Sequence, residues 1–303
     1  MANQIAIRLR YIGEAAPNFE EAVSFYEQAW GLKKVEHDTD VAFFAAESNP
    51  EQYIFRLRRD PDKRLDLIGF GVDTAAEVDA LASELASAGI RFAGEPGTLK
   101  TPGGGYGFRV FDPDGRVIEI SSDVETRKTR PLEHRESIPV GLSHIVLATP
   151  QVAEICDFYK SKIGFSQSDS IGTDMQFLTC DDEHHRVAVF KGGRQGLNHV
   201  AFEMRDSDEY MRATGRVMKY GGVLRWGPGR HLVGDNTFSY FFDPNGNVSE
   251  LTSDMEKLRG RAPITIRPED NGEIWGTAKR VSDDAVPQAF LLPETGHWVA
   301  PPL

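Results

Sequence analysis

A stretch of fifteen residues occurs twice in this chain of 303 residues. Residues 109–123 read RVFDPDGRVIEISSD, and residues 240–254 read YFFDPNGNVSELTSD. Both contain Phe-Asp-Pro, then Asp or Asn, then Gly, and both place a glutamate four residues after that glycine. An Asx-Gly pair between two apolar runs predicts a hairpin, because glycine accepts the positive φ that tight turns need. The chain is therefore expected to contain two hairpins of the same design.

Other landmarks recur at almost the same distance, which extends the repeat well beyond the hairpin. They include the pairs Phe25 and Phe158, Gly31 and Gly164, and Phe111 and Phe242. The first two pairs are 133 residues apart and the third is 131 residues apart. A drift of two residues over the whole unit predicts one duplicated structural unit with small changes in its loops.

Each copy reads as a strand, a helix and three strands, with a second helix before its end. In the second copy, residues 141–149 are strand-like, and residues 151–165 have helical spacing that stops at Gly164. Further predicted strands are 175–180, 186–190, 198–204, 239–243 and 247–253, and a second helix is predicted over 207–222. This mixture predicts an α+β fold.

A charged segment separates the two copies. Residues 125–139, ETRKTRPLEHRESIP, contain two prolines and no sustained apolar period, which is typical of a linker. We therefore expect a first domain over 1–124, a linker over 125–139, a second domain over 140–257 and a tail over 258–303. The tail is expected to pack on the second domain as irregular segments and short strands.

The charge balance excludes several kinds of partner. Lys and Arg total 34 and Asp and Glu total 46, so the net charge is -12. Such a surface repels phosphate backbones and anionic membranes, so we expect neither nucleic acid nor a membrane as partner. No signal peptide is recognisable in MANQIAIRLRYIG. Cys156 and Cys180 are too few for a disulfide framework, and the expected location is the cytoplasm.

Three residues of the second copy are candidate metal ligands. His144, His199 and Glu250 lie on three different predicted strands, 55 and 51 residues apart. Two imidazoles and one carboxylate leave open coordination positions, as in the facial triad of non-haem Fe(II) oxygenases. Taken singly, each has an ordinary explanation, because a histidine in an apolar strand is more often a core group and a glutamate after a hairpin is usually solvated or paired.

The first copy serves as an internal control for these three positions. Tyr11 stands where the second copy has His144, Leu67 stands in place of His199, and only the carboxylate is kept, as Glu119. A phenol, a leucine and one carboxylate make a poor site for a divalent metal. The second copy is therefore the one expected to hold a metal.

At this point the pattern resembles the vicinal oxygen chelate superfamily, and within it the type I extradiol ring-cleaving dioxygenases of the catechol 2,3-dioxygenase and dihydroxybiphenyl dioxygenase group. The resemblance covers residues 5–260 and is strongest over 227–251, GPGRHLVGDNTFSYFFDPNGNVSEL. It implies two tandem domains, each a pair of βαβββ modules forming an incomplete barrel around a central cavity. It also implies a non-catalytic first domain and a catalytic second domain, which assemble into a homo-oligomer.

The resemblance also implies an activity and its site residues. The activity is Fe(II)-dependent extradiol cleavage of a catechol-type ring by O2, with Mn(II) as a possible metal. His185, in an H-x-V-A setting, would act near O2 as an acid–base group. His184 is an open alternative, because the loop before this strand varies in length in the family. Strand alternation would turn the two histidines to opposite faces, so only one of them is expected to point at the metal. His231 and Tyr240 would hydrogen-bond the catecholate oxygens, and Asp235 is a looser match.

Two alternatives remain at this stage. One is another metal-dependent enzyme of the superfamily, a glyoxalase-like isomerase, although such sites generally use more carboxylates. The other is a metal-free binding protein of the bleomycin-resistance type, which would not need three metal ligands. The substituents of the aromatic diol are open, and Phe290, His297 and Trp298 in the tail are candidate pocket residues.

Overall fold

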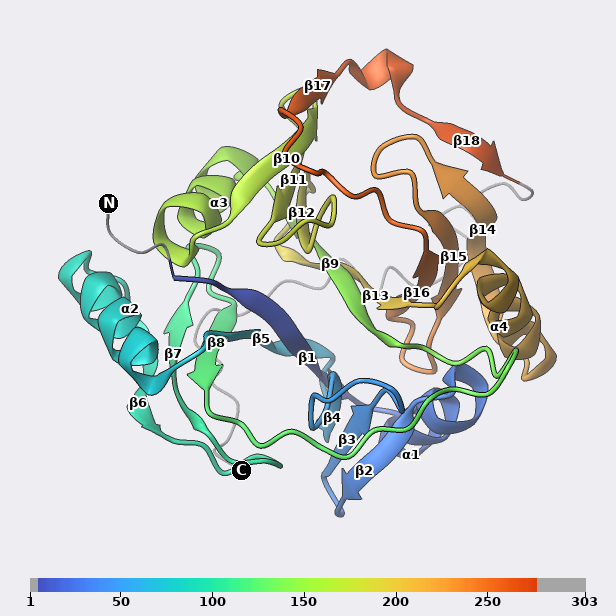
Figure 1. Ribbon diagram of the computed structural model, residues 1–303, viewed down its shortest axis with the longest axis horizontal. Helices are drawn as coiled ribbons and strands as arrows, with labels where there is room; N and C mark the ends of the chain where they lie inside the picture. The colour runs from blue at the N-terminus through green and yellow to red at the C-terminus, as the bar shows by residue number, and fades with distance from the viewer. Residues whose placement is uncertain (1–4, 277–303) are drawn as a thin grey trace.

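The computed structural model describes residues 5–276 of the chain, in two halves that each contain one large sheet (Figure 1). The first half, blue to teal, comprises β1 (Arg8–Ala16), α1 (Phe19–Ser24), η1 (Phe25–Trp30), β2 (Lys33–His37), β3 (Val41–Ala45), β4 (Phe55–Arg59), β5 (Arg64–Gly71), α2 (Ala75–Ser87), β6 (Phe92–Thr98), β7 (Tyr106–Phe111) and β8 (Val117–Ser122).

The second half, green to red, repeats this order and continues beyond it. It comprises β9 (Gly141–Thr149), α3 (Val152–Phe158), η2 (Tyr159–Ile163), β10 (Ser166–Ile171), β11 (Met175–Thr179), β12 (Val187–Lys191), β13 (Gly196–Glu203), α4 (Ser207–Lys219), β14 (Val223–His231), β15 (Thr237–Phe242), β16 (Val248–Ser253), β17 (Ile264–Ile266), η3 (Pro268–Asp270) and β18 (Glu273–Gly276). Among the described residues, no helix is long and apolar enough to cross a bilayer.

Each half contains two βαβββ modules joined through their first strands. The strand orders are β2-β3-β4-β1-β5-β8-β7-β6 and β17-β10-β11-β12-β9-β13-β16-β15-β14-β18. In both halves the first strands of the two modules pair antiparallel. The last strand of each module pairs parallel with the first strand of the same module, as in β9–β12 and β13–β16. The predicted α+β fold of tandem modules is thus confirmed.

The strand register places the two copies in equivalent positions. In each sheet, three residues on adjacent strands are cross-strand neighbours and form a row. The row is Tyr11, Gly69 and Glu119 in the first half, and His144, Ala201 and Glu250 in the second. Leu67 and His199 lie two residues before the middle member of each row. The side-chain differences inferred from sequence offsets are therefore differences at matching points of the same scaffold.

The helices that follow the first strands end in the same way in both halves. In each, a short α-helix continues as a π-helical turn, η1 or η2, and stops at a glycine with positive φ. These are Gly31, with φ of 85°, and Gly164, with φ of 103°. Only glycine adopts such angles without strain, which explains why these two glycines are landmarks of the repeat.

Within the two modules of the second half, the strands β10 and β14 were not located from the sequence. β10 reads SQSDSI, which lacks apolar residues until its last position, yet most of it is buried because β17 covers its outer edge. β14 reads VLRWGPGRH, in which two glycines and a proline predict a loop. The strand accommodates them by two irregularities in its pairing with β15, on either side of Trp226.

The tail after β16 runs along the second sheet and adds a strand to each end of it. β17 pairs parallel with β10, and β18 pairs antiparallel with β14. In Figure 1 these strands lie at the end of the second half remote from the first half. The domain and linker boundaries drawn from the sequence stay predictions, and residues 277–303 of the expected tail lie outside the described part.

The repeated hairpin turn joins the two halves. The turn of the second half contacts the first half, where the Asn18 side-chain amide donates to Pro244 O (2.9 Å) and Asn245 Oδ1 accepts from Asn18 N (2.7 Å). In the opposite direction, Arg116 of the first turn donates through Nη2 to Ala148 O (2.6 Å). Each copy of the turn thus packs on the other half, beside a core shared by both halves.

A buried carboxyl at this junction makes stability depend on pH. Glu14 is 1% exposed and accepts a hydrogen bond from the Asn247 side chain (2.8 Å). Burial, and then the charge of Asp243, raise the pKa of Glu14 well above its usual value of 4.5. The unfolded chain therefore loses this proton at lower pH than the folded chain, so folding stability falls as pH rises above 4.5.

We expect Glu14→Gln to be more stable than the parent chain at pH 8 by more than about 1 kcal/mol, because glutamine keeps the acceptor for Asn247 without a charge. The difference should vanish near pH 4. Urea unfolding at both pH values measures it, with the exposed Glu36→Gln as the matched control. A difference in the free energy of unfolding between variant and parent that is equal at both pH values would contradict this explanation.

Candidate metal centre and cavity

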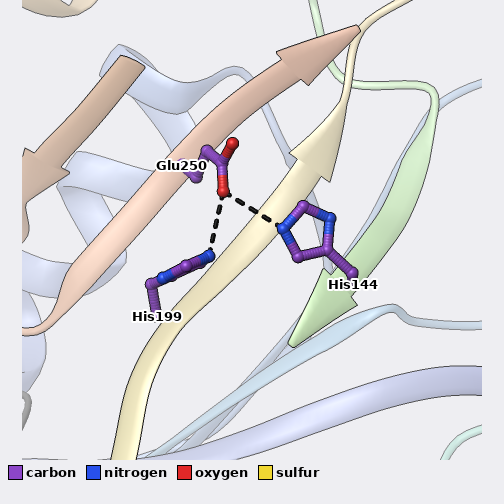
Figure 2. Close-up of side chains that lie close together, drawn as sticks. All are labelled: His144, His199 and Glu250. Carbon is purple, nitrogen blue, oxygen red and sulfur yellow. Dashed lines mark ion pairs between the residues drawn. The ribbon is translucent and has the colours of Figure 1, made fainter. Parts of the chain in front are cut away.

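His144, His199 and Glu250 converge on one point in the second half (Figure 2). They come from β9, β13 and β16, three neighbouring strands of the sheet. Glu250 Oε2 lies 3.2 Å from His144 Nε2 and 3.0 Å from His199 Nε2. All three residues are buried, and neither His199 Nε2 nor Glu250 Oε2 has a hydrogen-bond partner.

These separations fit a shared metal ion. Two ligand atoms about 2.1 Å from an octahedral centre and at right angles to each other are about 3 Å apart. Buried acceptor atoms without hydrogen bonds are otherwise costly, so a cation between them is the arrangement that satisfies all three. Two imidazoles and one carboxylate form the donor set that the sequence predicted, although their role as ligands stays a prediction.

Neighbouring side chains orient the two imidazoles. Asn198 Oδ1 lies 2.6 Å from His199 Nδ1, and Ser143 Oγ lies 3.0 Å from His144 Nδ1. The Asn198 oxygen can only accept and the Ser143 hydroxyl can accept, and a hydrogen bond donated by Nδ1 leaves the lone pair on Nε2, the nitrogen that faces Glu250. On the carboxylate, the Asn236 side-chain amide donates to Glu250 Oε1 (3.4 Å) and holds the other oxygen toward the histidines.

Burial keeps these imidazoles neutral at physiological pH. It lowers the pKa of His144 to about 3 and the pKa of His199 to about 4. Burial also raises the pKa of Glu250, since the carboxylate lies in the same dry environment. Neutral imidazoles bind metals, and a divalent cation would offset the cost of the buried carboxylate charge.

The equivalent point of the first half is closed. Glu119 is paired there with Arg109 (3.0 Å), which occupies the place that Tyr240 has in the second half. The surrounding space is filled by a buried apolar cluster: Tyr11, Val41, Phe43, Tyr53, Leu67, Phe111 and Val117. A carboxylate neutralised by a guanidinium and covered by aromatic rings has neither the charge nor the room for a metal.

A cavity of about 270 Å³ opens above the triad in the second half. One wall, from β9 to β12, is apolar and consists of Val146, Ile171, Met175, Phe177 and Phe190. The opposite wall, from β14 and β15, carries Trp226, His231 and Tyr240. Because β10 and β14 lie far apart in the strand order, a cavity between them requires the sheet to curl into an incomplete barrel.

His231 and Tyr240 lie together on the polar wall, and their roles toward the substrate stay predictions. His231 Nε2 and the Tyr240 hydroxyl are 2.9 Å apart. The His231 ring stacks on Phe238 with the centroids 4.0 Å apart, and the Tyr240 ring stacks on Trp226 at 5.3 Å. Burial lowers the pKa of His231 to about 3, so a neutral imidazole faces the cavity. Tyr240 also packs against the His199 ring at 4.9 Å.

His185 lines the cavity, with its ring centroid 4.3 Å from that of His144, whereas His184 lies behind it. The argument from strand alternation was wrong, because residues 181–186 precede β12 and are not part of a strand. Both rings point into the same region, with their Nδ1 atoms 2.9 Å apart. His184 therefore contacts His185 and does not compete with it for one position.

Asp235, the loose match, does not face the cavity. Its carboxylate pairs with Arg230 (2.9 Å) and is half exposed, so it is the neighbouring Asn236 that lines the cavity and contacts Glu250. Asn236 and Asn198 were not predicted from the sequence, although each is adjacent to a residue that was. Asn271, Gly272 and Glu273 of the tail also line the cavity. The three candidate tail residues Phe290, His297 and Trp298 lie outside the described residues.

A second cluster of possible ligand groups, Asp169, His184 and Glu256, does not form a comparable site. Arg261 forms ion pairs with Asp169 (2.8 Å) and Glu256 (2.6 Å), so both carboxylates already have a cation.

Comparison with known proteins places this geometry in a family. The profile of the Glyoxalase/Bleomycin resistance protein/Dioxygenase superfamily matches residues 8–120 and 141–251, one match in each half. Metapyrocatechase 2 of Cupriavidus necator is 26% identical over 75% of this chain and 72% of its own length. Biphenyl-2,3-diol 1,2-dioxygenase of Pseudomonas sp. (strain KKS102) is 25% identical over 89% of this chain and 96% of its own length.

Among solved structures, the Mn(II)-bound glyoxalase from Novosphingobium aromaticivorans superposes with a TM-score of 0.88. It is 38% identical to this chain, and the match covers 99% of this chain and 97% of that one. The paired modules, the cavity and the two profile matches agree. The chain belongs to the Glyoxalase/Bleomycin resistance protein/Dioxygenase superfamily.

Proposed function

We propose that this protein is a metal-dependent extradiol dioxygenase, which cleaves the ring of a catechol-type diol beside its two hydroxyl groups and adds both atoms of O2 to give a 2-hydroxymuconic semialdehyde-type product. The observation that carries the proposal is the combination of His144, His199 and Glu250 with His185, His231 and Tyr240 around one cavity. The similarity to metapyrocatechase 2 and to biphenyl-2,3-diol 1,2-dioxygenase supports it.

The proposed metal is Fe(II), with Mn(II) as the alternative. The triad donor set is the one used for non-haem Fe(II), and the same ligands also bind Mn(II). His144, His199 and Glu250 would hold the metal, which when bound would supply Lewis-acid binding of the diol and electron transfer between the ring and O2. Two neutral imidazoles and one carboxylate leave a net charge of about +1 there, which favours a catecholate monoanion.

The cavity fits one substituted aromatic ring. A cavity of about 150 Å³ holds benzene, so the 270 Å³ found here leaves room for the diol oxygens and a ring substituent. His231 and Tyr240, hydrogen-bonded to each other, would contact the diol oxygens from the polar wall and help to take up a phenolic proton. His185 would exchange a proton with the substrate beside the metal position.

The test is ring cleavage by the reconstituted protein. Metal-free protein is loaded with Fe(II) or Mn(II) under anaerobic conditions and mixed with catechol, 3- and 4-substituted catechols and 2,3-dihydroxybiphenyl. Oxygen uptake and a yellow product are expected on admission of O2. If neither metal supports oxygen uptake with any of these diols, the dioxygenase proposal is rejected.

A glyoxalase-type isomerase is the second candidate, because the structure with 38% identity is described as a glyoxalase. Its reaction would move a proton next to a carbonyl and would consume no O2. We rank it second because the exposed Glu273 is the only carboxylate among the described residues that line the cavity, and Glu250 is the only carboxylate of the triad. Assay of the same preparation with the thiol adduct of a 2-oxoaldehyde distinguishes the two reactions.

The proposal includes assembly as a homo-oligomer in the cytoplasm. The described part of the first half, residues 5–122, contains no second group of metal-binding side chains, so each chain is expected to bind one metal ion whatever the number of subunits. Light scattering after size-exclusion chromatography measures the assembly, and metal analysis per chain measures the stoichiometry.

A further inference from the structure

Behind His185, a row of buried polar groups leads away from the cavity. The Asp169 carboxylate lies 2.9 Å from His184 Nε2 through its Oδ2 atom, and His184 Nδ1 lies 2.9 Å from His185 Nδ1. All three side chains are buried. This leaves Nε2 as the His185 nitrogen that is available to the cavity.

The hydrogen-bond directions in this row follow from the groups present. An ionised carboxylate only accepts hydrogen bonds, so the proton of a neutral His184 must lie on Nε2. Its Nδ1 is then a lone pair, which can only accept, so the proton of His185 must lie on Nδ1. The pKa values of the two groups remote from the triad agree with these charge states, because hydrogen bonds from Arg261 and His184 outweigh burial and lower the pKa of Asp169, while burial lowers the pKa of His184.

We propose that Asp169 and His184 are positioning residues that fix the tautomer of His185, with its proton on Nδ1 and a lone pair on Nε2 toward the cavity. His185 then meets the substrate first as a proton acceptor, and it can donate only after it has taken a proton from a substrate hydroxyl group. This consequence for catalysis rests on the proposed dioxygenase function, whereas the tautomer itself does not.

The packing around the row holds both rings in place. Phe177 contacts both imidazoles, with ring centroids 5.2 Å from His184 and 5.1 Å from His185. On another side, the backbone of Gly234 approaches so closely that an added Cβ would lie 3.3 Å from His184 Nδ1 and 3.4 Å from His185 Cε1. A ring flip of either histidine would break the 2.9 Å contacts without a replacement partner.

The tail fixes the far end of the row. Asp169 Oδ1 accepts from Ile264 N (2.7 Å) and from Arg261 Nη1 (2.9 Å), and Oδ2 accepts from Arg261 Nη2 (2.8 Å) as well as facing His184. Oδ1 thus faces two other donors and Oδ2 only one. This difference decides how an amide would sit at position 169.

In Asp169→Asn, the amide nitrogen is expected to take the position of Oδ2. There it faces one other hydrogen-bond donor, Arg261 Nη2, whereas at the position of Oδ1 it would face two. It would then donate to His184 Nε2, shift the His184 proton to Nδ1, and leave His185 with its proton on Nε2. The variant therefore inverts the tautomer of both histidines. His184→Gln is the conservative counterpart, because its side-chain oxygen can still accept from His185 Nδ1.

Nitrogen NMR of the metal-free protein tests the tautomer directly. Long-range proton–nitrogen spectra at pH 7.5 distinguish protonated from unprotonated ring nitrogens, and the spectra of His184→Phe and His185→Phe assign the signals. We expect His185 with its proton on Nδ1 in the parent chain and on Nε2 in Asp169→Asn. A parent His185 with its proton on Nε2 overturns the proposal whether or not any variant folds.

Kinetics of the metal-loaded protein give the second readout. Asp169→Asn should keep one metal per chain and a KM within about threefold, while kcat falls by roughly 10²–10³, as for loss of an acid–base group. His184→Gln should retain kcat within about tenfold, and the exposed Asp174→Asn should be unchanged. If kcat of Asp169→Asn is unchanged, the positioning role is rejected. A parent chain that cleaves no diol rejects the proposed function instead, and the NMR result stands separately.

Discussion

Glu250→Gln is expected to lose the bound metal and ring cleavage together. The substitution keeps the shape of the side chain but replaces the only charged member of the triad with a neutral amide. Because loss of a group that merely orients a metal ligand costs 10–100-fold in affinity, we expect loss of the ligand itself to weaken binding by at least about 100-fold. Metal per chain after gel filtration, and oxygen uptake with a catechol, measure the two effects.

The chain contains its own matched control for this experiment. Glu119 occupies the same place in the first half, and Glu119→Gln should keep one metal per chain and a kcat within about twofold. It should lower the thermal stability instead, because the buried pair with Arg109 loses its charge (3.0 Å). Metal loss from Glu119→Gln, or full metal content in Glu250→Gln, would show that the triad is not the metal site.

His185→Phe is expected to separate metal binding from turnover. The ring of His185 contacts His144 but is not one of the three converging donors, so the variant should bind one metal per chain with the affinity of the parent. Loss of a positioned acid–base group lowers kcat by roughly 10²–10⁴. Phenylalanine fills the same space beside Phe177, so the fold should be retained.

Stopped-flow spectra check this result more sharply than steady-state rates. The variant should still form the diol complex under anaerobic conditions, and the slow step should follow the addition of O2. His134→Phe, in the exposed segment between the halves, is the control for the loss of one histidine. Unchanged kcat in His185→Phe would remove this residue from the reaction and direct attention to His231 and Tyr240.

Much of the fold was accessible from the sequence because the chain carries a duplicate of itself. A glycine that ends a helix with positive φ, or an Asp-Pro-Asx-Gly turn, is constrained by local backbone geometry and is recognisable without tertiary contacts. β10 and β14 lacked such signals. One is polar but covered by the tail, and the other contains glycines and a proline that only irregular pairing accommodates.

The triad could be proposed from sequence because the first half lacks its imidazoles at matching positions. The roles of His184, Asp235 and Asn236 could not be predicted from the sequence. These residues lie in loops, where side chains do not alternate between two faces as they do in a strand. Asp235 pairs with Arg230, which lies five residues earlier, and so leaves the cavity to Asn236. The partner of His184 is Asp169, fifteen residues away and fixed in turn by the tail.

Three properties are predictable from the amino acids alone: the duplicated α+β scaffold, the acidic net charge, and the half of the chain in which metal-binding side chains gather. Turns and the spacing of apolar residues depend on neighbouring positions in the chain, and net charge is a sum over residues, so none of them requires tertiary contacts. The contacts between distant side chains became visible only in the folded chain. They are the 3.0 and 3.2 Å approaches at Glu250, the closure of the first half by Arg109 and aromatic rings, and the row from Asp169 to His185. Such contacts join strands and loops distant in sequence, and the curl of the sheet brings them together.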